Sequence, residues 1–165
     1  YNKIAKYKLF KKGQKAMLSC FDVAKYFLSL ASEDAGDLIS NLKLQKLVYY
    51  AQGFHLALYD TPLFPEAIEA WTHKPAVPVL YEYYKKYGAG AIDYPNDVDF
   101  SIYNEETQGF LDEVYLVFGQ FSAWKLRNMT QEEYPWKLAA KNNTEISHKS
   151  MKEYFKTQLE SEEAV

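Results

Sequence analysis

The chain has 165 residues and a mass of 19.2 kDa; 48% of the residues are hydrophobic, 17% aromatic and 25% charged. This length fits one domain with a short tail, and the large apolar fraction excludes a disordered protein. The net charge of −3 and the pI of about 5.7 argue against a dedicated nucleic-acid binder, because an acidic surface repels phosphate.

The amino-terminal segment differs in charge from the rest. Residues 1–16 contain six lysines and no acidic residue, so the remaining chain is strongly acidic. We interpret residues 1–16 as a disordered or added extension, with Met17 as a candidate initiator; a tail that binds an acidic surface or anionic lipid is the alternative. Residues 17–160 form the expected single domain, and 161–165 an acidic tail.

The cellular compartment is inferred from what the chain lacks. There is no apolar run of membrane-spanning length and no secretory leader pattern. The single cysteine, Cys20, excludes an internal disulfide framework. We therefore expect a cytoplasmic protein that does not bind membranes.

The first helix is signalled by its cap. Ser19 can cap a helix over residues 20–32, and Asp22 lies where a carboxylate favours the positive end of the helix. An acidic loop over 33–37 then leads to Ser40, a second capping residue.

Residues 41–59 give the longest helix signal. Their apolar side chains fall on two sides of the helix, which predicts a central and largely buried position. His55 lies on an apolar side and is interpreted as a hydrogen-bonded core residue rather than a ligand. A third side offers polar and small residues that another element can approach closely: Lys46, Tyr50, Gly53 and Ala57.

The middle of the chain alternates short elements with loops. Pro62 and Pro65 end the long helix, and residues 67–71 read as one helical turn or a short strand. A helix of about two and a half turns follows and ends at Gly88. Alternating apolar residues over 98–102 indicate a short strand, whose expected partner is 67–71.

The carboxy-terminal part is predicted to be helical. One long helix is expected over about 105–127, and a capping box of Thr130 and Glu133 opens a short one. Ser147 or Ser150 caps a last helix. The expected fold is mainly α: a single compact domain of five to six helices around 41–59, with room for a two-stranded β element.

Enzyme motifs are missing from the sequence. There is no phosphate-binding glycine loop, no metal-ligand cluster at a known spacing and no nucleophile elbow, and the three histidines are scattered. We therefore predict a protein that is not an enzyme, with no cofactor and no metal.

Tyrosine and tryptophan are concentrated over residues 45–87, interleaved with lysine. Such residues are enriched at protein interfaces because they combine a large rigid area with one hydrogen-bonding end. Packing in the core is the alternative for each ring, and base stacking is disfavoured by the acidic body.

Several of these segments resemble a known family. The run Asn41–Tyr59 (NLKLQKLVYYAQGFHLALY) is similar to the Panacea antitoxin domain, also described as SocA-like or phage-associated. Further similarity lies in Pro62-Leu63-Phe64, Ile68–Trp71, Pro75, Val77-Pro78, Tyr81–Gly88, Met129–Trp136 and Ile146–Phe155. The resemblance covers most of residues 19–155 and implies a small, mostly helical domain encoded beside bacterial toxins.

The chain departs from the family pattern at two places. The family usually has Trp-x-x-Gly-Pro-Val, whereas this chain has Lys74 in place of the glycine. If that glycine has a positive φ in the family, Lys74 needs another backbone conformation. A Thr-His pair that is common before the Pro-Trp is Thr130-Gln131 here, which argues against histidine chemistry.

The resemblance implies an antitoxin of a bacterial or prophage toxin-antitoxin system that neutralises a cognate protein toxin by direct binding. The alternatives are an adaptor that delivers the toxin to a protease, and a DNA-binding regulator; the chain's acidic balance disfavours the latter, and no nucleic-acid partner is expected. The residues expected to form or support the toxin-binding face are Lys46, Tyr50, Trp71, His73, Pro75, Tyr81, Tyr84 and Lys85.

Overall fold

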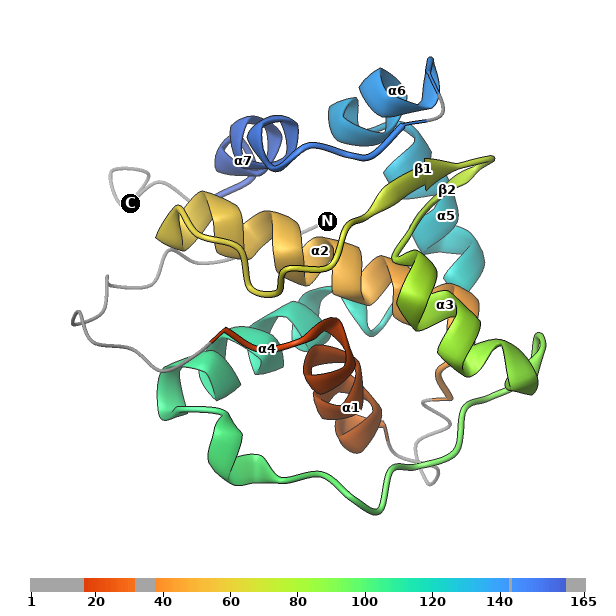
Figure 1. The fold of residues 1–165 in the computed structure, drawn as a ribbon, viewed down its shortest axis with the longest axis vertical. Helices are drawn as coiled ribbons and strands as arrows, with labels where there is room; N and C mark the ends of the chain where they lie inside the picture. Colours follow the sequence, from red (N-terminus) through yellow and green to blue (C-terminus); the bar gives the residue numbers. More distant parts are fainter. Residues whose placement is uncertain (1–16, 32–37, 143, 160–165) are drawn as a thin grey trace.

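A computed structural model of the chain describes residues 17–31, 38–142 and 144–159. The predicted extension 1–16, the loop 33–37 and the tail 161–165 lie outside the described residues. Within them the chain is mainly α, with seven α-helices and one small antiparallel hairpin (Figure 1). None of these helices is both long and apolar enough to cross a membrane.

The α-helices are α1 (Cys20–Leu30), α2 (Asn41–Tyr59), α3 (Pro78–Tyr84), α4 (Glu105–Phe118), α5 (Ala123–Gln131), α6 (Tyr134–Ala140) and α7 (His148–Lys156). The hairpin consists of β1 (Glu69–Trp71) and β2 (Lys74–Ala76). Two 3-10 turns complete the fold, η1 (Lys85–Tyr87) and η2 (Phe100–Ile102).

The start of α1 is fixed by local hydrogen bonds. The Ser19 hydroxyl accepts the Asp22 N–H at 3.1 Å, and the Asp22 carboxylate accepts the Ser19 N–H at 2.8 Å. This reciprocal capping box satisfies two amides that would otherwise lack a partner, and it confirms the predicted helix start. Glu66 accepts the Cys20 N–H at 2.9 Å and so ties the loop after α2 to the same end.

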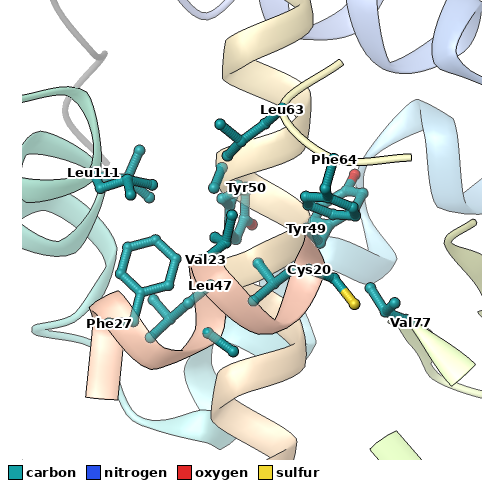
Figure 2. Close-up of a cluster of buried hydrophobic side chains, with 14 of the residues drawn as sticks. Cys20, Val23, Phe27, Leu47, Tyr49, Tyr50, Leu63, Phe64, Val77 and Leu111 are labelled. Atoms are coloured by element: carbon teal, nitrogen blue, oxygen red, sulfur yellow. The ribbon is translucent and has the colours of Figure 1, made fainter. Parts of the chain in front are cut away.

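Helix α2 is the centre of the molecule, as its apolar pattern predicts. Sixteen of its nineteen residues are buried, and it contacts α1, α3, α4, α5, α7 and β2. Figure 1 shows α2 crossing the middle, with α1 and α4 on one side and α7 and the hairpin on the other. Figure 2 shows Val23 of α1 facing α2 and Phe27 of α1 facing Leu111 of α4, with Leu63 and Phe64 from the loop after α2 close by.

Helix α7 approaches α2 closely at Gly53. A Cβ atom added to Gly53 would lie 2.1 Å from the ring of Phe155, so only glycine permits this contact. The Phe155 ring also lies edge-on to those of Tyr49 and Tyr50. The predicted strip of small and polar residues therefore does receive another element.

The predicted pairing of 67–71 with 98–102 is wrong. β1 pairs with β2, with Trp71 opposite Lys74 and Ala70 opposite Pro75. The Ala70 N–H points away from β2, to the Thr144 carbonyl at 3.1 Å, so Ala70 and Pro75 face each other as a non-hydrogen-bonded pair. Pro75 is tolerated there because its missing N–H would not have bonded to β1. Two residues suffice for the turn because His73 adopts a left-handed conformation, with φ 68°. Residues 100–102 form the turn η2 instead of a strand.

The predicted long helix 105–127 is also wrong, because two helices occupy this region. The backbone leaves α4 at Gly119, whose carbonyl accepts the Lys43 ammonium at 2.6 Å, and Ser122 caps α5 by accepting the Lys125 N–H. The predicted capping box of Thr130 and Glu133 does not form either. Thr130 belongs to α5 and donates to the Arg127 carbonyl. The extra break explains seven helices where five to six were expected.

The cap of the last helix is resolved in favour of Ser147. Its hydroxyl accepts the Ser150 N–H at 3.0 Å, so α7 begins at His148. Ser150 lies within the helix and donates its own hydroxyl to the Ser147 carbonyl at 3.0 Å.

Candidate functional site

Three of the predicted interface residues reach the surface on or beside the hairpin. His73 is exposed at the turn, while Trp71 in β1 and Tyr81 in α3 are half-buried. The rings of Trp71 and Tyr81 meet edge to face, with centroids 5.1 Å apart. These three residues therefore form a continuous surface.

The other predicted residues lie elsewhere. Lys46, Tyr50, Pro75 and Tyr84 are buried in the chain as it stands, so they can support an interface only from beneath. Tyr50 stacks on Phe118, with ring centroids 4.0 Å apart. Lys85 is exposed but lies in η1 and approaches Glu82 at 3.9 Å. Among the described residues, no hydrogen bond or ion pair joins the Lys85 side chain to the hairpin.

A cation completes the surface at the hairpin. The ammonium of Lys74, in β2, lies 5.0 Å from the centre of the Tyr81 ring and 5.9 Å from that of Trp71. Both distances lie in the range of cation–π attraction, which holds the ammonium over the rings.

Helix α5 contributes a second cation and a second ring. Arg127 lies 4.7 Å from the centre of the Trp124 ring, and 63% of the Trp124 surface remains exposed. The Gln131 amide donates to the His73 carbonyl at 2.9 Å and so ties α5 to the hairpin turn. We define the hairpin face as these exposed and half-buried residues: Trp71, His73, Lys74, Tyr81, Trp124 and Arg127.

The sequence did not point to Trp124 or Arg127, because residues 105–127 were read as one continuous helix. A signal was nevertheless present. Ser122 is a capping residue, and a helix beginning after it places Trp124 away from the buried Leu126. A large aromatic residue on the polar side of a helix is a feature of interaction surfaces.

The hairpin is held by the elements behind it. The Trp136 indole, from α6, donates to the Trp71 carbonyl at 3.1 Å. The outer edge of β1 bridges to Glu145, and the Ile146 N–H donates to the Ile68 carbonyl at 2.8 Å. In Figure 1 the hairpin lies beside α6 and α5. The hairpin face is therefore a preorganised surface rather than a free loop.

The polar residues of α2 have a different role. The Gln52 side chain accepts the Leu63 N–H at 2.7 Å and donates to the Phe64 carbonyl at 2.8 Å. Gln45 accepts the Val77 N–H at 2.8 Å, and Asn41 donates to the Tyr81 carbonyl at 3.1 Å. The polar side chains of Asn41–Tyr59 therefore hold the following loop and helix α3 against α2. They present little to a partner.

Lys46 is the exception within this polar network. Its side chain is fully buried, and its ammonium donates to the Leu42 carbonyl at 3.1 Å. Burial, and then the charges of Lys74 and Arg127, lower the pKa of Lys46 to about 7. Burial and the charge of Arg127 also lower the pKa of Lys74. Three cations from α2, β2 and α5 thus converge beneath and within the hairpin face.

Within residues 17–31, 38–142 and 144–159, no group of three or more His, Cys, Asp or Glu side chains could hold a metal ion. His55, which is mostly buried, is hydrogen-bonded to the Thr61 carbonyl through Nδ1 at 2.6 Å, and burial lowers its pKa to about 4. His55 therefore acts as a structural residue, as its apolar position predicts.

A model of the family described as "Antitoxin SocA-like, Panacea domain" matches residues 44–137. This span runs from α2 to α6 and includes every residue of the hairpin face. No curated protein and no solved structure matches the chain.

Proposed function

The chain belongs to the family of SocA-like antitoxins with a Panacea domain, and from this membership we propose that it neutralises a cognate protein toxin by binding it directly. Neutralisation by binding needs no catalytic group, because a bound partner can be occluded or held in an inactive conformation. We therefore propose a protein that is not an enzyme.

The hairpin face is the observation that carries this proposal. It combines two tryptophans, a tyrosine, a lysine and an arginine on one preorganised surface. Tryptophan, tyrosine and arginine dominate the residues that supply most of the energy at protein interfaces. Because the backbone of the hairpin is already held by Gln131 and Trp136, little ordering is needed when a partner binds.

The four buried residues of the predicted set support this face from below, whereas the exposed Lys85 lies apart from it in η1. Pro75 lies in β2 opposite Ala70, and Lys46 lies under the hairpin on α2. Tyr50 and Tyr84 are farther inside, where their substitution would disturb packing first. We therefore propose Trp71, His73 and Tyr81 as contact residues and the four buried residues as their support.

Growth rescue tests the proposal. The open reading frame adjacent to this gene is induced in a bacterium with and without the protein, and the two products are purified together from lysates. Relief of toxicity together with co-purification is the expected result. A toxic neighbour that the protein neither relieves nor binds would contradict the proposal.

Two exposed apolar residues offer a matched pair for locating the interface. Trp124 on the hairpin face is 63% exposed, and Leu116 on α4 is 72% exposed. We expect Trp124→Ser to abolish co-purification and rescue, and Leu116→Ser to leave both intact. The reverse pattern would place the interface on α4.

Toxin levels separate direct neutralisation from delivery to a protease. In cells that lack the ATP-dependent cytosolic proteases, direct binding predicts unchanged rescue and an unchanged amount of toxin on immunoblots. Loss of rescue in those cells would instead establish the adaptor mechanism.

A further inference from the structure

Among the described residues, Lys74 and Arg127 on the hairpin face and Lys46 beneath it form no ion pair with a carboxylate. Lys46, Lys74 and Arg127 come from three different elements, and the positive charges of Lys74 and Arg127 lie near enough to Lys46 to lower its pKa. Within the part of the chain that the structure describes, the ion pairs join other residues: Lys25 with Asp97, Lys85 with Glu82, Lys137 with Glu132 and Lys152 with Asp60.

An acidic residue is present nearby but is engaged otherwise. Glu69 accepts the Trp71 indole N–H at 2.9 Å, and among the described residues it forms no ion pair with a cation of the face. The aromatic rings hold Lys74 and Arg127 in place but do not neutralise them. The chain has 22 acidic residues against 19 basic ones, so the lack of a counter-charge here is not a matter of composition.

Unpaired buried charge is costly, and a protein that retains it commonly does so at a functional site. The Lys46 side chain has no exposed surface, and its one described acceptor is the Leu42 carbonyl one helical turn earlier. Because the carbonyl carries only a partial negative charge, it offsets only part of the positive charge that Lys46 carries when it is protonated.

We propose that Lys74 and Arg127 bind a carboxylate of the toxin, supplied by an Asp or Glu side chain, in front of the buried Lys46. The hollow lined by Ala70, Trp71, Thr72 and Lys74 gives such a side chain a place against the indole ring. A single carboxylate fits better than an extended polyanion, because the chain as a whole has a net charge of −3 and repels further negative charge. This inference rests on the proposed function and names the chemistry of its partner.

Charge reversal tests the inference with the full chain and the product of the adjacent open reading frame. The double variant Lys74→Glu/Arg127→Glu is expected to weaken the equilibrium dissociation constant by about 100-fold, because it turns a charge pair into a repulsion. The matched control Lys149→Glu/Lys156→Glu makes the same change in net charge on the exposed surface of α7 and should weaken binding less than about threefold.

Folding and rescue give independent readouts. Both double variants should keep a melting temperature close to that of the wild type, because all four substituted side chains are exposed or half-buried. Reversing each acidic residue of the toxin to Lys in turn should identify one position that restores binding to the charge-reversed chain. Equal binding by the wild type and the Lys74→Glu/Arg127→Glu variant would overturn the inference.

The outcomes distinguish the two proposals. A wild-type chain that neither binds nor rescues would overturn the proposed function, whereas a binding wild type with an equally binding charge-reversed variant would overturn only the carboxylate site. Displacement of the toxin by inorganic phosphate at millimolar concentration, or binding of duplex DNA lost in the same variant, would replace the carboxylate by a phosphate ligand and overturn the assignment.

Discussion

The interior of α2 and the hairpin face use polar residues in opposite ways. Along α2, Gln52 is buried and bonded on both sides to the backbone of the following loop, and the buried Gln45 accepts the Val77 N–H and donates to the Asn41 side chain. On the hairpin face, Lys74 and Arg127 lie against aromatic rings, and no described carboxylate pairs with them. Buried polar groups that are satisfied specify a fold, whereas charges that the fold leaves unpaired are available to a partner.

The segments that resemble the family therefore have two different roles, one as scaffold and one as surface. The long segment Asn41–Tyr59 is the most extensive part of the resemblance, and it forms the scaffold. The shorter segment around Trp71 forms the surface. A substitution in α2 should therefore act first on folding, and one on the hairpin face should act first on binding.

The largest effect on folding is expected at Gln52. Gln52→Leu keeps the side-chain volume but leaves the Leu63 N–H and the Phe64 carbonyl without this partner, which should lower the free energy of unfolding by about 3 kcal/mol. Urea denaturation measures this change. The control Gln120→Leu removes one bond to the Val117 carbonyl from an exposed side chain and should cost less than about 0.5 kcal/mol. Equal losses in the two variants would contradict the scaffold role of Gln52.

The close approach of α7 to α2 gives the next effect. Gly53→Ala places a methyl group inside the ring of Phe155, and we expect a loss of about 2 to 3 kcal/mol. Gly109→Ala in α4 is the control, because an added Cβ there meets no atom within 4 Å. It should stabilise the protein by about 0.5 to 1 kcal/mol through helix propensity. Thermal unfolding measures both changes in stability. A change of the same sign in the two variants would contradict the packing of α7 against α2.

Lys46 should destabilise the free chain at neutral pH. The pKa of Lys46 is about 7 in the folded chain and 10.5 in the unfolded chain. Between pH 7 and pH 10.5, Lys46 is therefore protonated in the unfolded chain and neutral in the folded chain. The stability of the wild type should therefore rise with pH across this window. Lys46→Met should be more stable by about 2 kcal/mol at pH 7, with the advantage shrinking toward pH 10.

Urea titrations of Lys46→Met and the wild type at pH 7, 8, 9 and 10 test this expectation. The exposed Lys137→Met serves as the control, and its difference from the wild type should not change with pH. An advantage of Lys46→Met that stays constant over the whole range would show that the burial of charge is not its cause.

His55 should give a smaller effect in acid. Burial lowers its pKa from 6.5 to about 4, so the folded chain keeps the imidazole neutral where the unfolded chain is protonated. Stability should be lost as the pH falls from 6.5 toward 4, and His55→Gln should reduce that loss by about 1 kcal/mol. Chemical denaturation at pH 7 and pH 4.5 measures it, with the exposed His148→Gln as control. An unchanged acid loss in His55→Gln would contradict the assignment.

The smallest effect on folding is expected on the hairpin face itself. Trp124→Ser removes an exposed ring and should change the free energy of unfolding by less than about 0.5 kcal/mol. The same variant is expected to lose the toxin. A loss of stability comparable to that of Gln52→Leu would show that Trp124 belongs to the scaffold.

Local signals in the sequence predicted much of the fold. Ser19 and Asp22 satisfy each other's backbone amides, so their spacing alone predicts the start of α1. The apolar residues on two sides of α2 require neighbours on both, which predicts its central position. Gly53 has no Cβ atom, which likewise indicated that another element approaches α2 closely. The structure identifies that element as α7.

The rest depends on contacts between distant residues. The break between α4 and α5 is stabilised by Lys43, which is far away in sequence. The hairpin depends on a left-handed His73 and on Thr144 as the partner of the Ala70 N–H. The prediction of the interface was incomplete for the same reason. Lys46 and Tyr50 are polar residues, but the fold buries them. Arg127 lies near Lys74 of the hairpin only because the fold brings α5 beside β2.

Amide hydrogen exchange of the free chain and of its complex with the product of the adjacent open reading frame tests the central claim most directly. The account predicts slowed exchange at the hairpin turn around His73 and in α5, with α4 around Leu116 unchanged. Slowed exchange confined to α4, with the hairpin turn and α5 unchanged, would contradict it.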